Sequence, residues 1–108
     1  MPTDLTVPRT ILAQLGGKTF LAMTGAKDLV GDEKSLMMKL RPNQSKANKL
    51  RITLNDNDLY NLEFMRLRKF EMKPVCKHEN IHVEDLQRTF TQVTGYDTIM
   101  PRIVGVNA

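Results

Sequence analysis

The spacing of apolar residues near the N-terminus predicts a helix followed by a strand. Val7, Ile11 and Leu15 recur at every fourth position, which places them on one face of a helix over about residues 7–15. The short apolar run within residues 18–24 is typical of a strand, and the polar stretch after it is typical of a loop. We therefore expect one helix and one strand in this part of the chain.

Two stretches in the middle of the chain have an apolar residue at every second position, with Met37, Lys39 and Arg41 on the other side of the first, which predicts two strands. Residues 35–41 place leucine or methionine at every second position, and residues 49–54 repeat the pattern with leucine and isoleucine. The polar loop 42–48 has an ordinary length for a wide hairpin connection. If the two strands pair, their apolar sides face the core together and their basic sides share the outer face.

Residues 59–73 are expected to form one long extended segment that contains a bulge or bend. The first apolar residues of this segment share one face, whereas Met65 and Leu67 fall on the opposite face. Pro74 follows the segment, and it lacks a backbone N–H group. We therefore expect strand pairing to be interrupted at Pro74.

A C-terminal helix is predicted over about residues 81–94, with its start at Ile81 or Val83. Val83, Leu86 and Phe90 are spaced by three or four positions, which gives the helix one apolar face. Acidic residues in its first turn favour the positive end of the helix dipole.

The order of these elements predicts an α+β fold class. We expect an antiparallel three- to four-stranded sheet, with the N-terminal helix 7–15 and the C-terminal helix 81–94 packed on one face. No repeat, low-complexity segment or linker divides the chain, so residues 1–108 are expected to form a single α+β domain. The tail 97–108 is expected to be loose or to form an edge strand.

The charged residues are distributed unevenly. The net charge is +4, yet the stretch from Lys34 to Arg51 holds six basic residues and no acidic one. A single cysteine excludes an internal disulfide, and no apolar run approaches the roughly 20 residues of a membrane span. The first residues lack the pattern of a signal peptide. Together these features favour a cytoplasmic protein.

The basic residues of the predicted hairpin are the candidate nucleic-acid-binding residues. They are Lys39, Arg41, Lys46, Lys49 and Arg51. Because residues 34–51 include no aromatic side chain, contact with the phosphate backbone is more plausible than base stacking. The alternative is a solvated outer face, because lysine and arginine are ordinary surface residues.

A literal H-E-x-x-H motif spans His78 to His82, a pattern that binds zinc in metalloproteases when all five residues are helical. The polar stretch 77–80 and the apolar face that begins only at Ile81 or Val83 predict that the motif straddles a helix start instead. No third histidine follows. We therefore expect no metal site, no cofactor and no catalytic residue here.

Several short segments resemble a group of small uncharacterised proteins encoded by bacteriophages and other bacterial mobile elements. The resemblance spans roughly residues 11–95. Its segments are Leu15-Gly16-Gly17 with Phe20, Met23-Thr24-Gly25-Ala26-Lys27, Ile52-Thr53-Leu54-Asn55, Asp58-Leu59-Tyr60, Glu63-Phe64 and Thr94-Gly95. The resemblance implies a bacterial cytoplasm, during phage infection or in a cell that carries an integrated element, and it implies no catalytic residues.

These observations predict a non-enzymatic accessory protein of a phage or mobile element that binds nucleic-acid backbone through a basic β-hairpin face. The alternative partner is a host or defence protein, which the chain would bind as a small inhibitor or adaptor through Met37, Met65 and Leu67. A zinc hydrolase that uses His78, Glu79 and His82 is the least favoured function.

Overall fold

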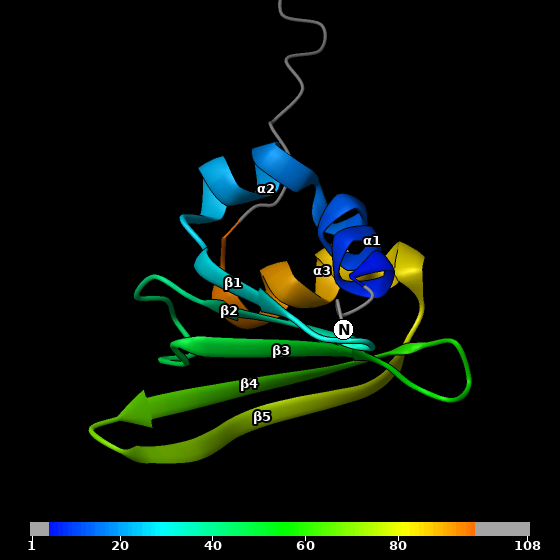
Figure 1. Cartoon of the computed structure of the whole chain (residues 1–108). Coiled ribbons are helices and arrows are strands. Elements are labelled where there is room, and N and C mark those ends of the chain that lie inside the picture. The colour runs from blue at the N-terminus through cyan, green and yellow to red at the C-terminus, as the bar shows by residue number, and fades with distance from the viewer. Residues whose placement is uncertain (1–4, 97–108) are drawn as a thin grey trace, which may run out of the picture.

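Three helices lie on one side of a five-stranded antiparallel sheet in this computed structural model, which describes residues 5–96 (Figure 1). The strands are neighbours in chain order, so the sheet is a simple meander. The α+β class is confirmed, and the sheet has more strands than the three to four expected. In chain order the elements are α1 (Thr6–Leu15), α2 (Gly17–Thr24), β1 (Lys27–Gly31), β2 (Ser35–Lys39), β3 (Lys49–Leu54), β4 (Tyr60–Arg68), β5 (Glu71–Ile81) and α3 (Val83–Thr94).

The hydrophobic core lies between the helices and the inner face of the sheet. Register pairs Leu36 with Ile52 and Met38 with Leu50, so the alternating strands turn their apolar sides inward as predicted. Phe20 of α2 and Phe90 of α3 are both fully buried, and their rings meet edge to face at 5.0 Å between centroids. The opposite face of the sheet is left uncovered by the elements of residues 5–96 (Figure 1).

The prediction of a strand at residues 18–24 was wrong, because this segment is the helix α2. Gly16 has a φ of 126°, which lets the chain leave α1 and start α2 at once. Phe20 and Thr24, one helical turn apart, are the buried residues of α2. An apolar run of this length fits a strand or a helix equally well by pattern, so periodicity alone could not separate them.

The prediction of a loop before residue 35 was also wrong, because Lys27–Gly31 forms the edge strand β1. The side chains of β1 are exposed or half-buried, and its register with β2 shifts between Lys27 and Val30. A strand without a buried side has no alternation of apolar and polar residues, so the sequence carries no period-two signal here.

The expected single extended segment 59–73 is instead part of the hairpin of β4 and β5. The chain turns at Lys69 and Phe70, and strand pairing continues through Pro74, which lies opposite Met65. Pro74 is tolerated because β5 is the edge strand and the register shifts beside it. At the end of the hairpin, α3 begins at Val83, the later of the two expected starts. The predicted tail 97–108 lies outside the described residues.

Asp32 holds the turn between β1 and β2. Its Oδ1 accepts hydrogen bonds from the backbone N–H groups of Lys34 at 2.9 Å and Ser35 at 2.8 Å. These bonds, that of Lys34 first, stabilise the carboxylate and lower the pKa of Asp32. The charged form of Asp32 therefore stabilises the fold.

Replacing Asp32 with alanine is expected to lower the free energy of unfolding by about 1 kcal/mol at pH 7, because its two hydrogen bonds to the backbone of Lys34 and Ser35 are lost. The pKa is lower in the folded state, so this contribution is complete above about pH 4 and is lost as the pH falls through the folded pKa. Urea denaturation between pH 7 and pH 2 measures the difference, with Glu33→Ala as the neighbouring control. If the difference in the free energy of unfolding between wild type and Asp32→Ala stays constant from pH 7 to pH 2, the stabilising role of the Asp32 carboxylate is contradicted.

Candidate functional site

Three lysines lie side by side across β1, β2 and β3, and we call them the lysine row (Lys27, Lys39 and Lys49). Lys27 lies opposite Lys39, and Lys39 lies opposite Lys49. Paired residues of antiparallel strands project from the same face, and the neighbours Met38 and Leu50 are buried in the core. The lysine row therefore belongs to the uncovered face of the sheet.

The lysine row has no acidic partner among residues 5–96. The four ion pairs within 4.0 Å in that part of the chain all involve other basic residues. Like charges directly opposite each other on adjacent strands repel and destabilise the pairing. The lysine row therefore destabilises the pairing of β1, β2 and β3 locally, and a bound polyanion would reduce the repulsion between the lysines.

The loop between β2 and β3 brings Lys46 to the same region. The Asn43 side chain donates hydrogen bonds to the carbonyl oxygens of Arg41 and Ala47, both at 2.8 Å, which shapes the loop from within. The Gln44 side chain donates to the carbonyl of Gln92 at 3.0 Å, which anchors the loop to α3. Lys46 therefore lies on a loop that is held by hydrogen bonds within the loop and by one hydrogen bond to α3.

A shallow hollow of about 500 Å³ lies beside this loop, and three cations line it. They are Lys39 of β2, Lys46 of the loop and Arg66 of β4. Asn48 also lines the hollow, and its side chain exchanges two hydrogen bonds with the backbone of Leu67, at 2.7 and 2.8 Å. The loop and β4 are thereby held together as one surface.

The two predicted arginines lie in different surroundings. Arg51 is on the uncovered face, but its register partners are Met37 on β2 and Glu63 on β4, so a carboxylate is close to its strand position. The stem of Arg41 lies against Gly25, where an added Cβ would come within 1.9 Å of the Arg41 Cδ. Of the five predicted residues, the structure therefore groups Lys39, Lys46 and Lys49 most closely.

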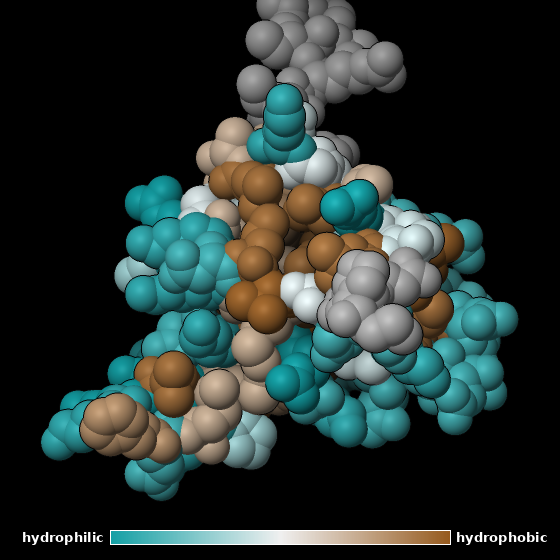
Figure 2. Space-filling view, viewed as in Figure 1, coloured by the Kyte–Doolittle hydropathy of each residue, from teal (hydrophilic) through white to brown (hydrophobic). Residues whose placement is uncertain are grey.

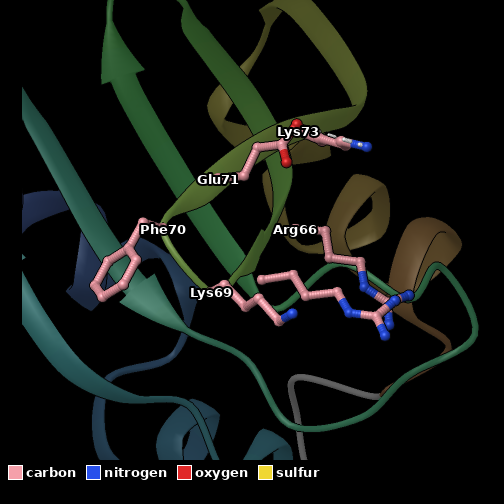
Figure 3. A pocket seen from close by; sticks show the side chains of 6 residues that line it. Arg66, Lys69, Phe70, Glu71 and Lys73 are labelled. Atoms are coloured by element: carbon pink, nitrogen blue, oxygen red, sulfur yellow. Dashed lines mark ion pairs between the residues drawn. The ribbon is translucent and has the colours of Figure 1, made fainter.

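A second cationic group lies at the end of the β4–β5 hairpin, and we call residues 66–73 the basic arm. The hairpin extends beyond the other strands in Figure 1. Its end surrounds a hollow of about 700 Å³ (Figure 3). The basic residues that line this hollow are Arg66, Arg68, Lys69 and Lys73. Its one carboxylate, Glu71, is 3.7 Å from the Nζ of Lys73, so the arm keeps a clear cationic excess.

Lys27 and the basic arm belong to this cationic region but were not predicted from the sequence. Lys27 joins it only through the register of β1 with β2, and no sequence pattern marks β1. Arg66 and Arg68 alternate along β4, which is a signal that could have been found. Because Arg66 lines both hollows, the two cationic groups adjoin.

The H-E-x-x-H residues do not share one helical turn. His78 is on β5, with its ring perpendicular to that of Phe64 at 6.3 Å, whereas His82 is the N-cap of α3. Within residues 5–96 no three His, Cys, Asp or Glu side chains gather as metal ligands would. Burial raises the pKa of the nearby Cys76 thiol, which disfavours the reactive thiolate.

No helix within residues 5–96 combines the length and the apolar character needed to cross a membrane. Comparisons with known proteins add no functional assignment to this surface. A scan against protein-family models found no match, and searches of curated proteins and of solved structures found no similar chain.

Proposed function

We propose that this chain is a non-enzymatic protein that binds the phosphate backbone of nucleic acids through the uncovered face of its sheet. The observation that carries the proposal is the lysine row, in which three like charges lie in register without a carboxylate within 4.0 Å among residues 5–96. Lys46 and Arg66 line the adjacent hollow with Lys39. Arg66 reaches it from the core side of β4, because it alternates with Met65, the register partner of Lys49.

The chemistry of the surface favours phosphate contact over base readout. Ammonium groups of lysine neutralise phosphates and release the counterions that the polyanion had condensed. The lysine row includes no aromatic side chain for base stacking, and an uncovered sheet face suits the side of a duplex. The resemblance to proteins of phages and mobile elements supports a bacterial cytoplasm as the setting.

Binding to duplex DNA is expected to weaken steeply with salt. If the lysine row, Lys46 and Arg66 each neutralise one phosphate, five contacts predict a slope of about −4 to −5 for log K against log salt concentration. Affinity should then fall by about 10²- to 10³-fold between 50 and 200 mM NaCl. Fluorescence anisotropy of a labelled 20-base-pair duplex measures the slope. A slope near zero, or no binding at 50 mM NaCl, would refute the proposal.

A protein partner is the second candidate, and one observation favours it. A hollow of about 260 Å³ on β4 and β5 is lined in part by the apolar residues Met65, Met72 and Pro74. Binding at such a hollow would bury apolar surface and would depend weakly on salt. A partner retained from host lysate after nuclease treatment, in 300 mM NaCl, would favour this function over the first.

A further inference from the structure

The tip of the basic arm carries an aromatic side chain that contributes nothing to the core. Phe70 is fully exposed, whereas Phe20, Phe64, Phe90 and Tyr60 are buried. Among residues 5–96 it is therefore the one fully exposed aromatic ring. Met72 and Val75 are also exposed, at 42% and 39%, and Figure 2 shows an apolar patch at the end of the hairpin, surrounded by hydrophilic side chains.

The backbone at the tip of the basic arm is strained. Lys69 has a φ of 56°, a left-handed conformation that two-residue hairpin turns normally assign to glycine or asparagine. Lys69 and Phe70 form the whole turn, because the flanking Arg68 and Glu71 are already paired. Phe70 does not share this conformation, so a glycine at position 69 alone would close the same hairpin more favourably, and the Lys-Phe pair suggests a role outside folding.

The directions of the side chains suit a nucleic-acid groove. In Figure 3 the Phe70 ring projects from the turn on the side opposite to the side chains of Arg66 and Lys69. A groove offers phosphates along its edges and stacked bases at its floor. A ring at the tip can therefore meet the bases while the cations stay at the phosphates.

We propose that the basic arm enters the minor groove of duplex DNA and that Phe70 wedges between two base pairs, which bends the duplex. This inference rests on the proposed function and names duplex DNA as the partner. Apolar side chains inserted from the minor groove unstack a base step and kink the helix. The cations beside Phe70 hold the phosphates of the kinked strands.

The length of the arm is sufficient for this insertion. Asn48 holds β4 at Leu67, so three further residues lead to Phe70, a reach of about 10 Å at about 3.3 Å per residue. The minor groove of B-DNA is about 7.5 Å deep, so the tip reaches its floor. A two-stranded arm is wider than the groove, which is about 6 Å across, so entry requires the groove to open, as it does at a kink.

One exposed aromatic suits a wedge better than a platform for single strands. Proteins that bind single-stranded nucleic acid stack successive bases on several aromatic side chains. Here the remaining aromatics of residues 5–96 are buried or half-buried, and the hydroxyl of the half-buried Tyr96 donates to the carbonyl of Pro42. The single exposed ring therefore favours insertion at one base step of a duplex over stacking along a single strand.

The test measures binding and bending separately on a 24-base-pair duplex that carries a fluorescent donor and acceptor at its ends. We expect saturating wild-type protein to raise the energy transfer between the ends. Phe70→Ala should bind within about fivefold of wild type, with an unchanged salt slope, and should not raise the transfer. The double variant Lys69→Gly, Phe70→Asn, which relaxes the hairpin turn, should also fail to raise the transfer, and its salt slope should fall by about 1 because the Lys69 cation is lost. Val83→Ala, another exposed apolar residue, should match wild type.

The outcomes separate this inference from the proposed function. Wild-type protein that saturates the duplex without bending it, or a Phe70→Ala variant that bends it fully, would overturn the wedge and leave backbone binding intact. Tighter binding to the single strand that depends on Phe70 would overturn the choice of a duplex. Wild-type protein that binds no DNA at 50 mM NaCl would overturn both proposals.

Discussion

Phe90→Ala is expected to lower the free energy of unfolding by about 3–5 kcal/mol. Phe90 is fully buried, and the centroid of its ring lies 5.0 Å from that of the Phe20 ring and 6.4 Å from that of the Phe64 ring. The ring therefore joins α2, α3 and β4, and its loss leaves a cavity that these elements cannot close. Because domains of this size are stable by only about 5–15 kcal/mol, the variant should be largely unfolded at modest urea concentrations.

Urea denaturation followed by circular dichroism measures this effect, and the chain provides a matched control. Phe70→Ala removes the same atoms from a fully exposed site and should change stability by less than about 0.5 kcal/mol. If Phe90→Ala does not fold at all, Phe90→Leu should fold with a smaller loss. Equal losses for Phe90→Ala and Phe70→Ala would show that the core is not organised around Phe90.

The double variant Lys39→Glu, Lys49→Glu is expected to bind duplex DNA about a hundredfold more weakly at 100 mM NaCl. Two phosphate contacts become repulsions, so the salt slope should also fall by about 2. Lys39 and Lys49 are directly opposed, and the variant keeps two like charges opposed. The stability of the sheet should therefore change little, and the loss reports on binding.

The matched control is Arg9→Glu, Lys18→Glu on the exposed surface of α1 and α2. It changes the net charge from +4 by the same amount, but on the helical side of the molecule. The affinity of this control variant for duplex DNA should stay within about threefold of wild type. An equal loss in both double variants would mean that overall charge, and not the lysine row, governs binding.

The elements that could be predicted from the sequence are those with one buried and one open side. The alternation of Leu36 and Met38 on β2 reflects a sheet covered on one face only, and the spacing of Leu86 and Phe90 reflects a helix packed on one side. The eight residues of α2 are too few to display a helical period. β1 has no buried side, so nothing in its composition distinguishes it from a loop.

The candidate site was predicted in part for the same reason. Lys39 and Lys49 follow from the alternation of two strands, whereas Lys27 joins them through pairing between distant segments, which no local pattern specifies. The turn at Lys69 and Phe70 contains none of the residues that usually close a hairpin, so the basic arm could not be recognised from turn chemistry. Its strain and its exposed ring became apparent only in the structure.

Mapping of backbone amide chemical shifts during titration with a 20-base-pair duplex at low salt tests most directly whether the uncovered face binds nucleic acid. The shifts should concentrate at the lysine row, the loop that carries Lys46 and the basic arm. The amides of α1 and α2 should stay unchanged. Shifts concentrated on the helices, or no shifts at saturating duplex, would contradict binding at the uncovered face.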